Sequence, residues 1–230
     1  MIVNRRNTLA CIGVLALGAG GYAAYSGWFH AVPLSTPAGG IGKARAQDKV
    51  DQAKLLEPST LGDRVLGAPD AKVVIIEYAS ATCPHCAHFH HETFPVLKKE
   101  YIDTGKVKFI FREFPLDNLA LAAFMLARCA PQDKYYPLID IFFEQQEKWT
   151  AGNPTDELFK IAQLAGFTRE SFDACLKNET IAKGIHEIRE RAGSAFGVDS
   201  TPTFFINGQV VRGAEPVEEF RKIIDAALAA

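Results

Sequence analysis

The chain lacks any concentration of positive charge, although lysine and arginine are not rare in it. Its 230 residues include 25 Lys and Arg against 27 Asp and Glu, and the formal net charge is −2. The basic residues are scattered, whereas a nucleic-acid-binding protein gathers them on one face or along one helix. The sequence therefore predicts that nucleic acid is not a partner.

Acidic residues are missing from the first 42 positions, where Arg5 and Arg6 carry the only charges. A mainly apolar run follows from Leu9 to Phe29, and its glycines would weaken a helix in water. A basic start followed by an apolar run is typical of an export segment. We therefore interpret residues 1–30 as a signal peptide or a membrane anchor, and we expect the remainder to lie outside the cytoplasm.

The export segment leaves two alternatives open. Ala24, Tyr25 and Ser26 form a small-x-small site suited to cleavage, but a run of about 20 apolar residues is also long enough to span a bilayer. Arg5 and Arg6 fit either a twin-arginine signal or the basic start of a general secretory signal. Each alternative places the rest of the chain outside the cytoplasm.

Cysteine is scarce, with five residues in the chain, and Cys11 falls inside the export segment. The other four, Cys83, Cys86, Cys129 and Cys175, would meet an oxidising compartment. Only Cys83 and Cys86 have the CxxC spacing. Redox or metal chemistry at this pair is the first functional hypothesis.

The pattern of apolar residues around the CxxC pair predicts a strand, a helix and a second strand. Residues 72–79 (KVVIIEYA) form an apolar, β-branched run typical of a strand buried on both faces. Apolar positions then recur at helical spacing from Cys86 to Tyr101, with Pro95 expected to kink the helix. Residues 106–114 alternate as a second strand, and such a crossover unit favours a parallel pair.

The remaining pattern predicts an α/β fold interrupted by helices. A helical block follows the second strand, and Asn207-Gly208 later marks a hairpin turn between two short strands. We predict an export segment at residues 1–30, a linker at 31–57, one α/β domain built from 58–114 and 198–230, and an inserted all-helical domain at 115–197.

Cys83 and Cys86 lie directly after a buried strand and at the first turn of a helix. Free backbone N–H groups and the helix dipole stabilise a thiolate at Cys83, and the thiolate is the nucleophile. His85 adds a partly positive side chain that lowers the pKa of Cys83 further. Because a stabilised thiolate is a good leaving group, the pair is expected to donate its disulfide rather than to reduce others.

Four histidines near the dithiol make a metal site the main alternative, with a purely structural disulfide as another. They are His85, His88, His90 and His91. Thiolate and imidazole suit zinc or copper(I). Histidines spread along one helix point in several directions, however, and the chain holds no second CxxC. We therefore expect no metal and no cofactor, with His88 and His91 on a solvated helix surface.

The dithiol Cys83-Pro84-His85-Cys86 has Glu77 six residues before it and Thr201-Pro202 ahead of the last strands. With the helical insertion, these features resemble the DsbA family of thioredoxin-fold disulfide oxidases. The resemblance covers residues 58–230 and implies a thioredoxin-like fold with an inserted all-helical domain.

The resemblance also implies roles for single residues. Cys83 would form the mixed disulfide with substrate, Cys86 would be its resolving partner, and His85 would tune the potential. Glu77 would be a buried acid that assists proton movement at Cys86; the alternative is a strand residue facing solvent.

Thr201 and Pro202 would bind substrate, with Pro202 in the cis form and Thr201 offering backbone hydrogen bonds to an extended segment. A trans bond in an ordinary loop is the alternative. Cys129 and Cys175, 46 positions apart, resemble a second pair found in α-proteobacterial DsbA-like proteins. The resemblance favours a structural disulfide between them over two free buried thiols.

Taken together, these features predict a monomeric periplasmic thiol:disulfide oxidoreductase that donates its Cys83–Cys86 disulfide to folding exported polypeptides. The resemblance implies reoxidation by a DsbB-type membrane quinone reductase. A disulfide isomerase or reductase remains an alternative, although residues 31–57 are short for a dimerisation domain. A metal-delivery protein and a chaperone-like binder are the alternatives from other classes.

Overall fold

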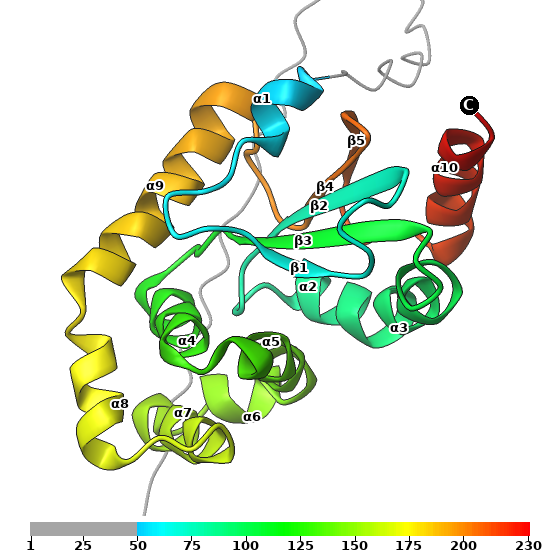
Figure 1. The fold of residues 1–230 in the computed structure, drawn as a ribbon. Coiled ribbons are helices and arrows are strands. Elements are labelled where there is room, and N and C mark those ends of the chain that lie inside the picture. Colours follow the sequence, from blue (N-terminus) through cyan, green and yellow to red (C-terminus); the bar gives the residue numbers. More distant parts are fainter. Residues whose placement is uncertain (1–49) are drawn as a thin grey trace, which may run out of the picture. The chain divides into compact units, whose positions relative to one another are not determined.

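The computed structural model describes residues 50–230, and the predicted export segment lies outside them, as does most of the predicted linker. The described part is a five-stranded sheet in the order β1-β3-β2-β4-β5, with helices covering both of its faces (Figure 1). The strands are β1 (Arg64–Leu66), β2 (Val73–Ala79), β3 (Val107–Glu113), β4 (Thr203–Ile206) and β5 (Gln209–Arg212). Strands β2 and β3 are parallel and the other neighbours are antiparallel, so the predicted crossover unit is confirmed.

Alternation along the central strand gives the sheet two different faces. Ile76 and Tyr78 of β2 pack in a smaller cluster beneath α9, whereas Ile75 points into the larger core on the opposite face. Successive strand side chains point to opposite faces, so Glu77 shares the face of Ile75. That face carries the helix that follows the dithiol.

The helix after the dithiol is irregular. It runs through α2 (Pro84–His88), a π-helical turn (Phe89–Thr93), α3 (Phe94–Leu97) and a second π-helical turn (Lys98–Ile102). Pro95 has no N–H to donate inside the helix, and wide turns on either side of α3 accommodate it. Two π-helical turns, one on each side of α3, therefore stand where the sequence predicts a kink at Pro95.

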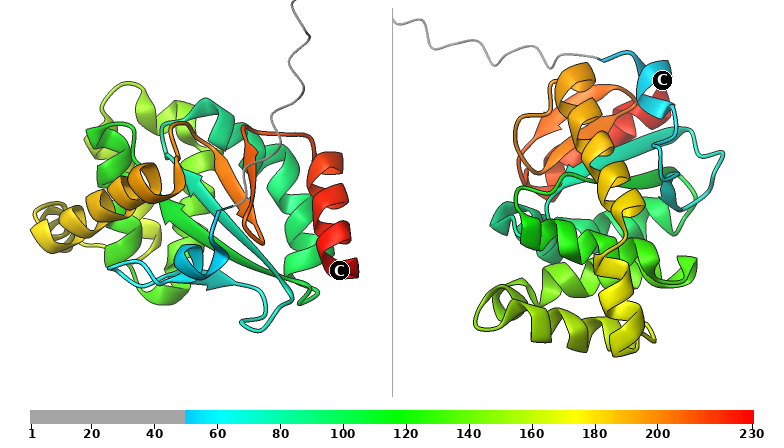
Figure 2. Two further views of the ribbon diagram at one scale, coloured as in Figure 1. Left: turned by 90° about the horizontal axis from the view of Figure 1, so that it is seen from above. Right: turned by 90° about the vertical axis from the view of Figure 1, so that its left-hand side faces the viewer.

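Helices fill the chain between β3 and β4. They are α4 (Asn118–Cys129), η3 (Gln132–Lys134), α5 (Tyr135–Glu144), α6 (Gln146–Thr150), α7 (Pro154–Leu164), α8 (Arg169–Leu176) and α9 (Glu179–Phe196), and α10 (Val217–Ala229) ends the chain. Helix α9 extends from α8 to the sheet (Figure 2). Its residue Arg191 donates to the carbonyl of Lys54, in the helix of residues 52–56, at 2.6 Å. It ends at Gly197, whose φ of +65° is the left-handed conformation favoured by glycine at a helix C-terminus.

A disulfide joins two helices of this block. Cys129 at the end of α4 and Cys175 in α8 are bonded, with their Cα atoms 6.1 Å apart. The hairpin turn also follows the sequence, because Asn207 and Gly208 both have positive φ, as a tight turn between β4 and β5 requires.

Three local predictions need correction. Residues 50–57 of the predicted linker 31–57 belong to the folded body: α1 (Gln52–Leu56) buries Leu55 at 2% exposure, and Val50 donates to the carbonyl of Gly208. Within the predicted helical block, residues 135–149 form two helices, α5 and α6, that meet at Gln145. Strand β1 was not predicted, since its three residues show no buried alternation.

Within residues 50–230, none of the helices combines the length and apolar character needed to cross a membrane.

Candidate active site

The dithiol lies at the carboxyl end of β2, where the chain turns into α2. Cys83 is the N-cap residue of α2, and its N–H donates to the carbonyl of Ser80 at 3.0 Å. Pro84 follows at the first helical position, where a missing N–H costs nothing and the fixed φ suits a helix start. Cys83 is 6% exposed and Cys86 is fully buried. The Cys83 residue therefore lies close to the surface, and Cys86 lies beneath it in the interior.

Cys83 is in an environment that favours the thiolate. A hydrogen bond from the Cys86 thiol is the largest cause that lowers its pKa to about 5, against burial, which raises it. The Thr201 side chain and the backbone N–H groups of Cys86 and His85 lower the pKa further. The imidazole of His85 is exposed, so in this structure His85 contributes through its backbone. Tuning by its side chain stays a prediction.

Cys86 has the opposite character. Its pKa is raised well above the ordinary value, first by burial and then by the neighbouring Cys83 sulfur and the charge of Glu77. Between about pH 5 and neutrality the reduced pair therefore holds one proton, and that proton is on Cys86. This asymmetry lets Cys83 leave as an anion while Cys86 needs a proton whenever its bond to sulfur breaks.

Glu77 lies in the middle of β2 with an exposed fraction of 0%, so the alternative of a solvent-facing strand residue is wrong. Its two carboxylate oxygens are 3.0 and 3.2 Å from the Nε2 atom of His90. The sequence analysis did not identify His90 as this partner. The signal was present, however, because His90 follows Cys86 by one helical turn, and positions four apart share a helix face.

The loop before β4 contacts the dithiol directly. The Thr201–Pro202 peptide bond is cis, so the alternative of a trans bond is wrong. The Cys83 Sγ atom lies 3.4 Å from the carbonyl oxygen of Thr201, to which the thiol donates. The hydroxyl of Thr201 is buried and has no other hydrogen-bond partner within residues 50–230. These contacts bring together residues that are 118 positions apart in the chain.

The helical insertion also supports the active-site loop. The side-chain amide of Gln146 donates to the carbonyl oxygens of Ala81 at 2.8 Å and Cys83 at 3.0 Å. On the other side of the loop, Thr82 donates to the carboxylate of Asp117 at 2.7 Å. No sequence motif marks Gln146, and its function depends on tertiary structure alone. A groove of about 590 Å³ lies beside Pro84, between α2 and the junction of α5 and α6.

The four histidines near the dithiol separate in space. His85 and His88 are exposed, His90 is buried against Glu77, and His91 lies within 3.1 Å of the carbonyl oxygen of Phe143 through its Nε2 atom. Across residues 50–230, no three His, Cys, Asp or Glu side chains are grouped so as to hold a metal ion. The geometry therefore offers no support for the metal-site alternative.

A thioredoxin family model matches residues 59–226. Proteins of Rickettsia bellii and Rickettsia conorii, named as candidate protein-disulfide oxidoreductases, are 41% and 38% identical over 64% and 72% of this chain. The chain spans only 57% and 60% of the length of these two relatives.

Two further matches cover most of their counterparts. The disulfide bond formation protein D of Bacillus subtilis is 26% identical over 75% of this chain and 80% of its own length. The crystal structure of alpha-DsbA1 from Wolbachia pipientis superposes with a TM-score of 0.72 at 34% identity, covering 78% of this chain and 96% of that one. Both the sequence and the fold thus match proteins named for disulfide chemistry.

Proposed function

Because the chain belongs to the thioredoxin family, among its DsbA-like protein-disulfide oxidoreductases, we propose that it oxidises other proteins by donating the Cys83–Cys86 disulfide. The observation that carries the proposal is the difference between the two sulfurs. The pKa of Cys83 is lowered to about 5, whereas that of Cys86 is raised. A reduced form with a stabilised thiolate makes the disulfide a strong oxidant.

The proposed reaction has two exchange steps. A substrate thiolate attacks Cys83 Sγ, the Cys83–Cys86 bond breaks, and its electron pair goes to Cys86, which takes up one proton. The second substrate cysteine, as a thiolate, then attacks the substrate sulfur of the mixed disulfide, and Cys83 leaves as a thiolate. The substrate has lost two electrons and two protons to become a disulfide. The protein has gained both electrons and one of the protons.

The proposed substrates are exported polypeptides that are still folding. An extended segment would pair with the Thr201–Pro202 loop, which contacts Cys83 and so places a bound substrate cysteine beside the sulfur that it attacks. In this proposal residues 58–114 and 198–230 carry the chemistry, and the insertion 115–197 supports the active-site loop. The insertion is held together by the Cys129–Cys175 disulfide.

The proposed setting is the periplasm, where residues 1–30 would deliver or anchor a monomer. A DsbB-type membrane quinone reductase would return the dithiol to the disulfide. Reoxidation reverses the proton balance, because the Cys86 thiol must then lose its proton. The same buried sulfur therefore exchanges one proton in each half of the cycle.

Equilibration with glutathione buffers tests the proposal. The fraction of Cys83–Cys86 disulfide is quantified after acid quenching and alkylation, with Cys83→Ser as the unreactive control. We expect a potential well above that of thioredoxin, which is about −270 mV. A potential as reducing as thioredoxin's would instead assign the protein to the reductases. Oxidation of a reduced, unfolded model substrate by the protein in stoichiometric amount would then complete the test.

A further inference from the structure

The proton on Cys86 has no direct route to solvent. Cys86 and Glu77 are both fully buried, and the charge of Glu77 contributes to the raised pKa of Cys86. The proposed function, on which this inference rests, requires a proton to enter this site and to leave it once in each cycle. A buried carboxyl beside a buried thiol can hold the proton but needs a second group to pass it outward.

His90 is the group in contact with the buried carboxyl of Glu77. Its Nε2 atom is 3.0 Å and 3.2 Å from the two oxygens of Glu77, and its side chain is 3% exposed. The ring stacks on Phe143, with the centroids 4.1 Å apart and the planes at 18°, and it also contacts Phe94. Packing on both sides therefore fixes the ring in one orientation.

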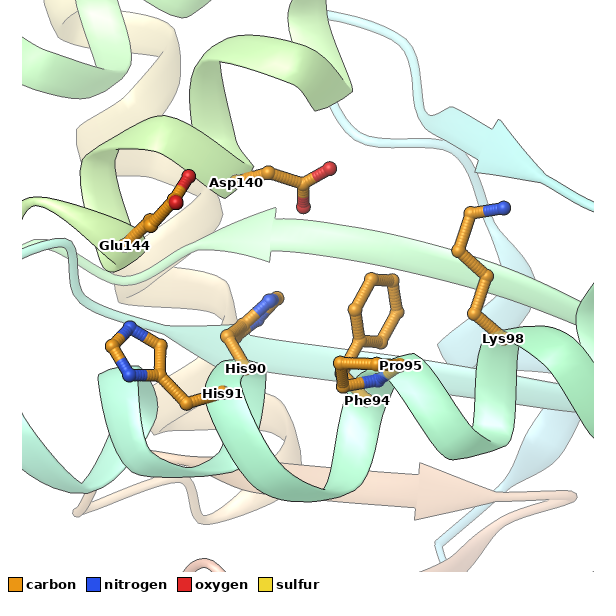
Figure 3. Close-up of a pocket in the computed structure, with 7 residues that line it drawn as sticks. All are labelled: His90, His91, Phe94, Pro95, Lys98, Asp140 and Glu144. Carbon is orange, nitrogen blue, oxygen red and sulfur yellow. The ribbon is translucent and has the colours of Figure 1, made fainter.

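A cavity of about 510 Å³ lies on the outer side of His90, between the irregular helix and α5 (Figure 3). Four charged or titratable side chains line it besides His90, from both elements: His91 and Lys98 on the helix, Asp140 and Glu144 on α5. Partial burial raises the pKa of Asp140, while the charges of His90 and Lys98 lower it. His90 thus contacts a fully buried acid and also lines a cavity that carries four other charged or titratable side chains.

The second nitrogen of the ring argues against a purely structural ion pair. The Nδ1 atom of His90 is buried and has no hydrogen-bond partner within residues 50–230. A histidine kept only to neutralise an acid normally has its other nitrogen satisfied by a carbonyl, a carboxylate or water. An unpaired Nδ1 beside a cavity large enough for several waters leaves one end of the ring free to exchange a proton.

We propose that His90 is a positioning residue that passes the Cys86 proton between Glu77 and the cavity bounded by α5. When substrate attacks Cys83, the Nε2–H of His90 gives its proton to the Glu77 carboxylate, which passes it to the departing Cys86 sulfur. The Nδ1 atom of His90 takes a proton from water in the cavity. During reoxidation the same transfers run in the opposite direction, and the proton taken up from the cavity returns to it.

The test compares His90→Gln with His91→Gln in the full chain. Glutamine keeps a polar contact to Glu77 but does not titrate, and His91 lines the same cavity without touching Glu77. Reduction of the oxidised protein by dithiothreitol is followed by rapid quenching and alkylation. We expect His90→Gln to be slower by about tenfold or more, His91→Gln to match the native rate, and the thiolate absorbance of Cys83 to titrate alike in all three.

Two measurements separate a proton relay from a structural effect. In His90→Ala, the lost ring enlarges the cavity, and added imidazole should restore the rate, with no such effect on His91→Ala. In the native protein, the rate of reduction by dithiothreitol should vary non-linearly with the deuterium fraction of the solvent, because more than one proton moves. This measurement needs no substitution, so it does not depend on whether a variant folds. A straight line, or a slow His90→Ala that imidazole does not accelerate, would overturn the proposal.

The outcome for His90 is separable from the outcome for the oxidase. If the native protein has an oxidising potential but His90→Gln reacts at the native rate, the relay is wrong and the proposed function stands. If the native potential is as reducing as thioredoxin's, the oxidase is wrong, while the variant rates still report on proton transfer at Cys86.

Discussion

Two buried glutamates on adjacent parallel strands are neutralised in different ways. Glu77 in β2 contacts one histidine nitrogen, and the other nitrogen of that ring is unpaired within residues 50–230. Glu113 at the end of β3 accepts from Arg128 through both oxygens and from the Tyr135 hydroxyl at 2.6 Å. Both carboxylates are fully buried. Burial alone therefore does not distinguish a mobile proton from a fixed charge.

The difference lies in the cation and in its remaining hydrogen bonds. The Arg128 guanidinium cannot lose its proton under physiological conditions, and it also donates to the carbonyl of Gly62 at 2.7 Å. The site at Glu113 is saturated and permanently charged, as a structural pair requires. In the pair of Glu77 and His90 the partner of the acid is an imidazole instead of a guanidinium, and its Nδ1 atom is unpaired within residues 50–230, as the proposed relay requires.

The strongest test of the structural pair is Arg128→Met. We expect the free energy of unfolding to fall by about 3–5 kcal/mol, because Glu113 is left as a buried charge without its cation. Urea unfolding of the full chain measures the change. Arg221→Met is the matched control, since its partner Glu100 is partly exposed and the loss should stay below about 1 kcal/mol. An Arg128→Met protein of native stability would contradict the structural assignment.

The disulfide next to Arg128 belongs to the same structural region. Replacing Cys129 and Cys175 together by alanine should lower the free energy of unfolding by about 2–4 kcal/mol, because a loop of 46 positions is no longer closed. Urea unfolding and the thiolate absorbance of Cys83 should be measured on the same samples. The absorbance titration should not move, and a shifted midpoint would show that the two regions are coupled.

At the dithiol, the contribution of Cys83 to the free energy of unfolding should instead depend on pH. Cys83 has a pKa of about 5 in the folded protein and about 8.5 when unfolded. Between these values the unfolded chain binds more protons, so the stability of the reduced protein rises with pH and is lost again as pH falls through about 5. Thermal unfolding from pH 4 to pH 8 measures it. The oxidised form, which has no thiol at Cys83, should lack this rise.

The smallest expected effect on stability, that of Glu77→Gln, is also the most direct comparison of the two glutamates. Glu77→Gln should change the free energy of unfolding by no more than about 1 kcal/mol, because it removes a buried charge whose partner can be neutral. Glu113→Gln, its matched control, should cost about 3 kcal/mol, since Arg128 would remain charged. Urea unfolding at pH 7 compares the two variants. Equal losses would remove the distinction between the two glutamates.

Much of the fold could be predicted from local patterns. The buried strand before the dithiol, the crossover to β3 and the hairpin at Asn207-Gly208 all depend on short-range periodicity or turn chemistry. The inserted block between β3 and β4 is helical, as the sequence predicts. Strand β1 and the packing of α1 escaped prediction, because short segments of mixed burial show no clear period.

The site divides in the same way. Cys83 and Cys86 could be identified because their residue type and spacing carry chemistry in themselves, whereas Glu77 was identified through the family resemblance. His90 and Gln146 could not, since each acquires its meaning from a contact across the fold: His90 with Glu77 and Gln146 with the carbonyls of the active-site loop. Helical spacing places His90 on the same helix face as Cys86, but the sequence does not show that Glu77 contacts that face.

The contacts of Gln146 and Thr201 also have a consequence for the order of folding. Gln146 lies 63 positions and Thr201 lies 118 positions after Cys83 in the chain. While the chain is still being synthesised, its CxxC segment lacks both partners, and its thiols are those of an ordinary peptide. The active site is complete only when the last strands have joined the sheet, so the dithiol of a partly folded chain lacks the reactivity of the native pair.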